Sequence, residues 1–328
     1  MQDFKYYNPS DIKNAYKKLA DSKSESIIYA GGTDILGLIK NYIISPDTVV
    51  NIKNLENFNF ISHSDSAGLR IGAATKVADI AANPVIKEKF TCLAEAAKAV
   101  ASPQLRNMGT IGGNLCQRPR CWYFRGEFNC LRKNGDICYA YDGENKFHCI
   151  TGGGPCYIVH PSDIAVALTA LDAELVIFNG KSDRNVKISD FFILPETDYL
   201  KENILEKGEI IKEIFVPSPP KGTKSTYIKA MERDVWDFAV VSVAAVISKS
   251  GDKAENGKIA FGGIAPVPWQ DKILNAGLKD LAADENEFSK LTDKILPDAD
   301  PLEKNGYKVV LSKNLVKKSL RKILLNNG

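Results

Sequence analysis

The sequence predicts an α+β fold, with a large region that reaches about residue 220 and a smaller one after it. Short apolar runs bounded by glycine alternate with Ala-rich or amphipathic stretches over the first region. The run PSPPKG at 217–222 has the composition of a linker. A chain of 328 residues is also too long for one small core, so two or three domains are expected.

The first region is expected to alternate helices with strands. Residues 8–22 predict a helix that Ser10 can cap, because apolar residues recur at Ile12, Ala15 and Leu19. Three further segments follow: a strand, a glycine turn and an apolar run that fits a helix over 26–41, a strand over 48–55, and a strand passing into a helix that closes near Pro84 over 69–90. An Ala-rich helix then begins at residue 90 and is expected to end near Pro103.

Later segments continue the same alternation. A helix leading into a strand is expected over 162–178, and a strand over 209–217. Residues 225–249 fit either strand or buried helix, 257–269 predict a strand, and the charged C-terminal end predicts helix.

Composition excludes several classes of protein. The net charge is +3, from 43 basic and 40 acidic residues, and no basic cluster indicates a nucleic-acid partner. No apolar run approaches the roughly 20 residues of a membrane span, and the first residues lack an apolar signal region. We therefore expect a cytoplasmic protein, or a periplasmic one only if it is exported with a partner subunit.

Two glycine turns share one design. YAGGTDI (29–35) and GTIGGNL (109–115) each place paired glycines beside a threonine. Such turns let backbone N–H groups approach an anion, so the pair could hold a pyrophosphate from two sides. Neither matches the GxGxxG fingerprint or the P-loop, and each alone is typical of an ordinary tight turn.

Most of the cysteines lie in one segment, between the second glycine turn and the helix expected from residue 162. Five of the seven, Cys121, Cys130, Cys138, Cys149 and Cys156, lie within 36 positions of a glycine-rich segment. No CxxC pair typical of zinc sites occurs, and the common ferredoxin spacings are also absent. The spacing alone is compatible with three interpretations: an iron–sulfur cluster, a zinc ion, or cysteines that are unliganded or disulfide-bonded. Basic residues in the segment (Arg118, Arg120, Arg125, Arg132 and Lys133) favour a negatively charged object nearby.

A family resemblance follows from the order of the motifs. YAGGTDI, GTIGGNL, HPSDIAVALTALDAELVI, YIKAMERDVWDFAVVSVAA and FGGIAPVPW run along nearly the whole chain. Together they resemble the FAD-binding (medium) subunit of molybdenum hydroxylases of the xanthine dehydrogenase and carbon monoxide dehydrogenase type. The resemblance implies a two-lobed FAD-binding domain of the vanillyl-alcohol oxidase-like (PCMH) type over 1–220, with lobes about 1–56 and 57–220. It also implies a smaller C-terminal α+β domain over 221–328.

The cysteine segment forms an insertion, about residues 116–157, that resembles two subgroups of this family. These are the flavin subunits of 4-hydroxybenzoyl-CoA reductase and of aldehyde oxidoreductases, which carry an extra 4Fe-4S cluster there. The motif RCWYFR (120–125) favours the aldehyde oxidoreductases. The resemblance implies the ligands Cys121, Cys130, Cys138 and Cys156, with Cys149 held in reserve.

The resemblance also implies a flavin site and no catalytic acid or base in this chain. Its FAD-binding residues would be Ala30, Gly31, Gly32, Thr33, Asp34 and Ile35 in the first turn, Thr110, Ile111, Gly112, Gly113 and Asn114 in the second, and Asp163, Ile211 and Lys229 elsewhere.

The implied function is electron transfer. A large partner subunit with the molybdenum cofactor would carry out substrate chemistry, and a small partner subunit would hold 2Fe-2S clusters. This chain would add FAD and the 4Fe-4S cluster and serve an external carrier such as ferredoxin, within a heterotrimer. The enzyme would be an aldehyde oxidoreductase, or else one like hydroxybenzoyl-CoA reductase or xanthine dehydrogenase. A self-contained flavin oxidoreductase and a zinc-stabilised binding module are the competing hypotheses.

Overall fold

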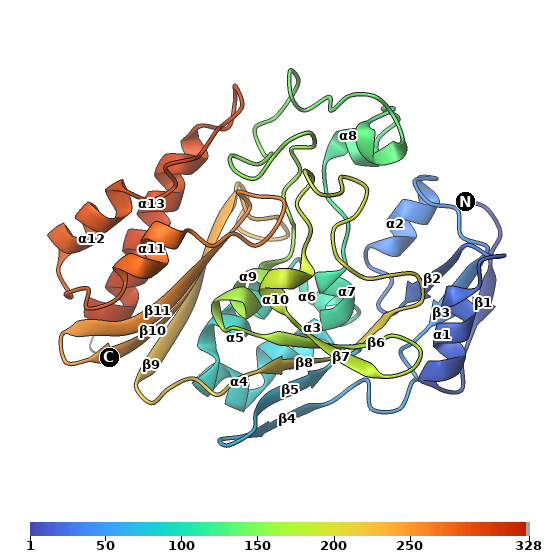
Figure 1. Ribbon diagram of the computed structural model, residues 1–328, viewed down its shortest axis with the longest axis horizontal. Helices are drawn as coiled ribbons and strands as arrows, with labels where there is room; N and C mark the ends of the chain where they lie inside the picture. Colours follow the sequence, from blue (N-terminus) through green and yellow to red (C-terminus); the bar gives the residue numbers. More distant parts are fainter. Residues whose placement is uncertain (326–328) are drawn as a thin grey trace.

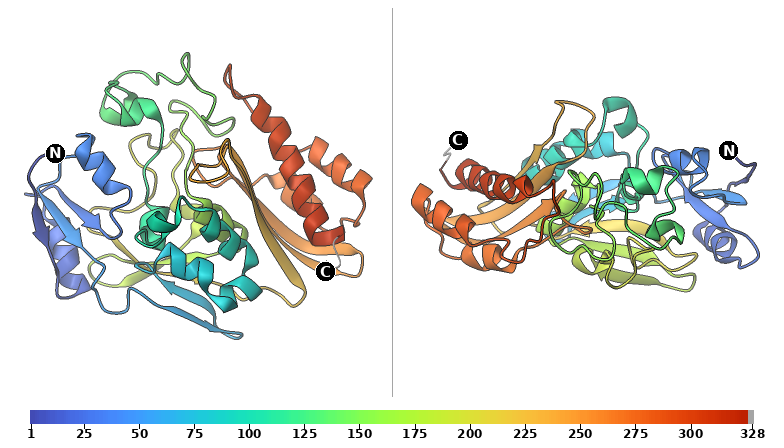
Figure 2. Two further views of the ribbon diagram at one scale, coloured as in Figure 1. Left: turned by 180° about the vertical axis from the view of Figure 1, so that it is seen from behind. Right: turned by 90° about the horizontal axis from the view of Figure 1, so that it is seen from above.

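The computed structural model describes residues 1–325 and confirms the predicted α+β class. Three sheets lie side by side along the long axis of the molecule (Figure 1). The N-terminal lobe and the C-terminal helices occupy opposite ends (Figure 2). No helix in the described range is long and apolar enough to cross a membrane.

The N-terminal lobe is a small parallel sheet with two helices. Its strands β1 (Lys5–Tyr7), β2 (Ser26–Tyr29) and β3 (Thr48–Asn51) pair in the order β1-β3-β2. Helix α1 (Ile12–Ala20) links the first two strands, and α2 (Ile35–Lys40) follows β2. Asp11, rather than the predicted Ser10, caps α1 by accepting the Asn14 N–H at 2.8 Å.

The second lobe contains an antiparallel sheet of five strands. They are β4 (Ile61–Ser64), β5 (Gly68–Gly72), β6 (Glu174–Phe178), β7 (Asp183–Lys187) and β8 (Ile210–Val216), in the order β4-β5-β8-β6-β7. Strand β8 therefore lies between β5 and β6, although it follows both of them in sequence. The long segment that connects β5 to β6 holds the second glycine turn and the cysteine segment.

Helices pack beside this sheet. They are α3 (Val77–Ala82), α4 (Pro84–Lys89), α5 (Thr91–Ala99), α6 (Pro103–Arg106), α7 (Ile111–Leu115), α9 (Asp163–Ala170) and α10 (Ile188–Phe191). Pro84 and Pro103 each stand in the first turn of a new helix, after the expected break. This position suits proline because the first N–H of a helix has no partner within the helix. Helix α9 is buried on all sides, which explains why all its residues except Asp163 and Thr169 are apolar.

The C-terminal region is an antiparallel sheet covered by helices. Strands β9 (Thr223–Ala230), β10 (Val241–Ser250) and β11 (Lys253–Gly262) pair in chain order. Residues 225–249 thus form strands and the loop between them, not a buried helix. Helices α11 (Lys272–Gly277), α12 (Glu285–Asp293) and α13 (Tyr307–Leu320) follow, and a π-helical turn η2 (Arg321–Leu325) ends the described chain.

One large hydrophobic core joins the sheets, a smaller core lies in the C-terminal region, and a third small cluster of Leu38, Phe124 and Cys130 joins α2 to the cysteine segment. The larger core fills the second lobe and reaches Tyr227, Ala244 and Ala260 of the C-terminal sheet. The smaller core lies between that sheet and its helices. One face of β9–β11 therefore packs against α5 and α9, which fixes the C-terminal region against the second lobe.

The cysteine segment forms a long irregular loop above the other elements (Figure 1). It contains only the short helix α8 (Trp122–Arg125) and the 3-10 turn η1 (Leu131–Lys133). Buried side chains of the C-terminal region hold it in place. Lys308 Nζ donates to the carbonyls of Phe147 and His148, and Asn305 Nδ2 donates to those of His148 and Cys149.

Candidate flavin and iron–sulfur sites

The first glycine turn presents free backbone donors. It joins β2 to α2, and Gly32 adopts a φ of +72°, which a residue with a side chain rarely adopts. None of the backbone N–H groups from Gly31 to Ile35 donates a hydrogen bond within residues 1–325. A run of unpartnered N–H groups can receive an anion such as a pyrophosphate.

Several backbone N–H groups of the second glycine turn already donate hydrogen bonds to other groups of the protein. Thr110 caps α7 by accepting the Gly113 N–H at 3.3 Å. The N–H groups of Ile111 and Gly112 donate to the carbonyls of Thr75 and Ala73, both at 2.9 Å. This turn therefore contributes shape more than donors, in contrast to the first.

The two turns are in direct contact because glycine permits it. A Cβ on Gly31 would lie 2.2 Å from the carbonyl oxygen of Met108, just before the second turn. One on Gly109 would lie 3.5 Å from Thr33 Oγ1. The pairing inferred from the sequence motifs thus has a physical basis in close backbone packing.

A cavity of about 380 Å³ opens beside both turns. Of the predicted flavin residues, those that line it are Ala30, Gly31, Gly32, Thr33, Asp34, Ile35, Thr110, Gly112, Gly113 and Ile211. Ile111 is buried in the core instead, and Asn114 Oδ1 accepts a hydrogen bond from the Ser162 hydroxyl at 2.5 Å. The sequence motifs missed a second wall, formed by residues 116–118 and 200–203.

Asp34 connects the first turn to the cysteine loop. Its carboxylate accepts the Arg118 N–H at 2.8 Å and an N–H of Arg125 at 2.8 Å, and it also pairs with Arg120. Burial would raise the pKa of Asp34, but Arg120 and Arg125 outweigh it and hold the pKa below its usual value. The carboxylate is therefore ionised and fully engaged by the loop.

Asp163 and Lys229 form a buried ion pair. Lys229 Nζ donates to Asp163 Oδ2 at 2.8 Å, and the Tyr227 hydroxyl donates to Oδ1 at 2.5 Å. Burial raises the pKa of Asp163, against the opposing effect of Lys229. Asp163 and Lys229, which the family resemblance both assigned to FAD binding, thus lie together, although neither lines the larger cavity.

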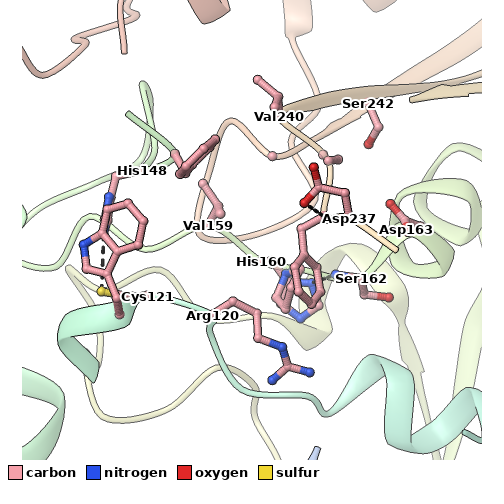
Figure 3. Close-up of a pocket in the computed structure, with 17 residues that line it drawn as sticks. Arg120, Cys121, His148, Val159, His160, Ser162, Asp163, Asp237, Val240 and Ser242 are labelled. Atoms are coloured by element: carbon pink, nitrogen blue, oxygen red, sulfur yellow. Dashed lines mark hydrogen bonds between the residues drawn. The ribbon is translucent and has the colours of Figure 1, made fainter. Parts of the chain in front are cut away.

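Asp163 lines a second, smaller cavity of about 150 Å³ (Figure 3). This cavity lies between the cysteine loop and the C-terminal sheet, with Cys121 and His148 at one end and Asp163 and Ser242 at the other. Arg118 lines the larger cavity and Arg120 the smaller one, so one short segment borders both.

Three buried side-chain atoms of residues that line the smaller cavity have no hydrogen-bond partner within residues 1–325. They are His148 Nδ1, His160 Nε2 and Ser242 Oγ. Burial lowers the pKa of His148 to about 4 and that of His160 to about 3, so both rings are neutral near pH 7. His148 Nε2 lies 3.3 Å from Cys121 Sγ. The imidazole of His148 therefore touches a predicted cluster ligand on one side and a cavity on the other.

The four predicted ligand cysteines gather in the loop. The Cys156 thiol donates to Cys138 and lowers the pKa of the Cys138 thiol to about 6. Burial raises the pKa of Cys121 to about 11, and the charges of Cys138 and Cys130 act on it as well. Cys149 is near Cys138, and burial raises its pKa to about 12. All seven cysteines are free in the described residues, so the disulfide alternative has no support there.

The thiols do not form a site for a single metal ion. Across residues 1–325, no three or more His, Cys, Asp or Glu side chains are grouped closely enough to hold one. A zinc ion bonded at about 2.3 Å needs sulfurs about 4 Å apart, whereas a cluster of several irons separates its thiolates more widely. The four thiols therefore lie near one another, beside the buried side chain of Arg132, without being grouped as the ligands of one ion.

The fold and the glycine-lined cavity together define a class: flavoprotein subunits of molybdenum-dependent dehydrogenases. Residues 2–219 match the family model described as the FAD binding domain in molybdopterin dehydrogenase, and residues 226–326 match the CO dehydrogenase flavoprotein C-terminal domain. The chain belongs to this family and is an FAD-binding medium subunit of a molybdenum hydroxylase. It is the flavoprotein component of an oxidoreductase.

Relatives support this membership along the whole chain. The chain is 36% identical to the aldehyde oxidoreductase FAD-binding subunit PaoB of Escherichia coli over 289 residues, 87% of each chain. It is 28% identical to the glyceraldehyde dehydrogenase medium chain of Sulfolobus acidocaldarius, over 98% of each chain. The carbon monoxide dehydrogenase structure from Hydrogenophaga pseudoflava superposes with a TM-score of 0.77 at 24% identity, covering 99% of this chain and 98% of the other, and shares its fold.

Proposed function

We propose that this chain is the electron-transfer subunit of an aldehyde oxidoreductase. It would bind FAD and an additional 4Fe-4S cluster, between the 2Fe-2S clusters of a small partner subunit and an external carrier such as ferredoxin. A large partner subunit would hold the molybdenum cofactor and the substrate. The name of the 36% identical relative supports aldehyde as the substrate class. An enzyme like xanthine dehydrogenase, whose named relative is 25% identical, or like hydroxybenzoyl-CoA reductase is the alternative.

The observation that carries this proposal is the free edge of the first glycine turn. Five consecutive N–H groups, Gly31 to Ile35, have no partner in the described residues and border a cavity of about 380 Å³. A pyrophosphate bound there would receive hydrogen bonds from these groups and from the positive end of α2. A bound flavin exchanges one or two electrons, which suits a subunit between one-electron centres.

Other residues would shape the flavin site and exclude water from it. Leu38, Ile52, Ile210 and Ile211 give the larger cavity apolar walls. Ion-paired Asp163 and Lys229 would fix the far end of the flavin site, next to the smaller cavity. No side chain of this chain needs to act as acid or base on the substrate.

Cys121, Cys130, Cys138 and Cys156 would hold the 4Fe-4S cluster. Cys130 and Cys156 are buried, whereas Cys121 and Cys138 are partly exposed, so the cluster would have one face toward solvent. That face would suit exchange with an external carrier. Cys149 is buried near Cys138 and would stay outside the ligand set.

The division into an FAD-binding domain over 1–220 and a C-terminal domain over 221–328 is part of the same proposal. The two family models meet between residues 219 and 226, which supports a boundary there. Within the first domain, the parallel sheet and the antiparallel sheet would correspond to lobes of about 1–56 and 57–220, with the cysteine loop of 116–157 inserted in the second.

The test is purification of the native complex without oxygen, followed by cofactor and metal analysis. We expect FAD, molybdenum and iron in excess of the 2Fe-2S complement, and aldehyde oxidation only by the assembled complex. Turnover by this chain alone would support a self-contained flavin oxidoreductase. Zinc without any visible chromophore would support the binding module.

A further inference from the structure

Arg132 places a buried positive charge at the edge of the cysteine loop. Its side chain is 1% exposed, and its Nη2 donates to the Glu202 carboxylate. Its Nε and Nη1 groups have no hydrogen-bond partner within residues 1–325. The Cys156 sulfur lies beside the same guanidinium and is the group nearest to accepting from it, although the geometry is not that of a complete hydrogen bond. Glu202 balances the charge of Arg132, but two buried N–H donors that lack an acceptor are still costly.

Glu202 extends this charge toward the flavin cavity. Its Oε1 also accepts from Arg118 Nε at 3.0 Å. Both Arg118 and Glu202 line the larger cavity, whereas Arg132 faces Cys156. The Glu202 carboxylate therefore lies between Arg118, which borders the proposed flavin site, and Arg132, which faces a proposed cluster ligand.

We propose that Arg132 is a positioning residue for the iron–sulfur cluster, donating its free N–H groups to cluster or thiolate sulfur and raising the cluster's reduction potential. This inference rests on the proposed function, because it requires a cluster in the loop. Reduction adds negative charge to the cluster, so a fixed cation nearby favours the reduced state. Glu202 carries the opposite charge and opposes this effect.

A purely structural role for the Arg132–Glu202 pair makes a different prediction. If the pair only fastens η1 to residues 200–203, then Arg132→Gln and Glu202→Gln break the same contact and act alike on stability. The electrostatic role predicts shifts of the reduction potential in opposite directions, since the two substitutions remove opposite charges.

The experiment measures the cluster's midpoint potential in the full chain, purified without oxygen, by redox titration followed by electron paramagnetic resonance. Iron is counted on every sample. We expect Arg132→Gln to lower the potential, Arg132→Lys to keep it closer to the unsubstituted chain, and Glu202→Gln to raise it. Arg184→Gln is the matched control, because it removes a different arginine–glutamate pair on β7, and it should leave the potential unchanged.

The outcomes separate the inference from the proposed function. Unchanged potentials, or shifts of Arg132→Gln and Glu202→Gln in the same direction, overturn the role of Arg132. If Arg132→Gln binds too little iron to titrate, Arg132→Lys and Glu202→Gln decide the sign. An unsubstituted chain without iron refutes the cluster itself.

Discussion

Asp34 accepts a hydrogen bond from Arg125 Nη2 at 2.8 Å, and this contact ties the flavin turn to the cysteine loop. Asp34 lies at the start of α2, and Arg125 ends the short helix α8. The same carboxylate pairs with Arg120. One acidic side chain therefore links the two proposed cofactor sites, through a contact between residues 91 positions apart in sequence.

Replacing Asp34 should loosen the loop. Asp34→Asn leaves two partly buried guanidinium groups without their carboxylate, at a cost of about 1.5–3 kcal/mol. We expect faster amide hydrogen exchange over residues 117–126 and weaker retention of iron. Protection equal to that of the unsubstituted chain would show that other contacts hold the loop.

Acid should release the same link. The pKa of folded Asp34 lies below its ordinary value of 3.8, so the stabilisation is fully present above about pH 4 and is lost as pH falls through the folded value. Trp122 neighbours the link and contributes to the tryptophan fluorescence, which should be constant from pH 7 to about pH 5 and change below it. His148, whose pKa is about 4, contacts the Trp122 ring and contributes to the same change. Asp34→Asn should make the transition smaller, and a transition of unchanged size in this variant would assign it to His148 or another group.

Glycine in the first turn should be required for FAD binding. In Gly31→Ala the new Cβ would lie 2.2 Å from the Met108 carbonyl oxygen, so the turns must separate. We expect FAD affinity to fall about tenfold or more, equivalent to about 1.4 kcal/mol, by fluorescence titration. Gly37→Ala in α2 is the control, because its Cβ would meet nothing within 4 Å. It should stabilise the helix slightly and leave affinity intact.

Breaking the ion pair behind the smaller cavity should destabilise the protein. Lys229→Met leaves the Asp163 carboxylate buried without its cation, at a cost of about 3–5 kcal/mol. Urea denaturation should show this loss in the free energy of unfolding. The exposed pair of Lys258 and Asp172 supplies the control, since Lys258→Met should cost less than about 1 kcal/mol. Equal effects of the two substitutions would contradict the burial argument.

The ligand assignment predicts different results for two neighbouring cysteines. Cys138→Ser should remove the cluster signal and leave FAD bound, because only the loop loses a ligand. Cys149→Ser should retain both. Iron analysis and absorption spectra on the same samples decide between them, and four irons per chain in Cys138→Ser would mean that the ligand set is wrong.

Local signals predicted many of the elements. The apolar run at 162–178 forms α9 and β6 as expected, because burial on all sides leaves no polar face to blur the pattern. The expected helix ends near Pro84 and Pro103 are confirmed, since α3 ends at Ala82 and α5 at Ala99, but the short helices that each proline begins were not predicted. Residues 225–249 could not be assigned from periodicity, because a buried strand and a buried helix are both continuously apolar.

The site was less accessible to sequence reasoning wherever it depends on tertiary contact. Both glycine turns were visible as motifs. The sequence did not show that Thr75 and Ala73 accept from the second turn, whereas the N–H groups of the first turn have no partner within residues 1–325. Glu202 lies in a loop that contains no recognisable motif. It contacts Arg118 and Arg132 only because the folded chain brings residues 200–203 to the larger cavity. Asp163 and Lys229 meet because α9 packs on the sheet that contains β9.

The most direct test of the flavin site is a crystal structure of the full chain purified without oxygen and with FAD added. The account predicts pyrophosphate oxygens within hydrogen-bonding distance of the N–H groups of Gly31 to Ile35. A pyrophosphate placed elsewhere, with those N–H groups bonded only to water, would contradict it.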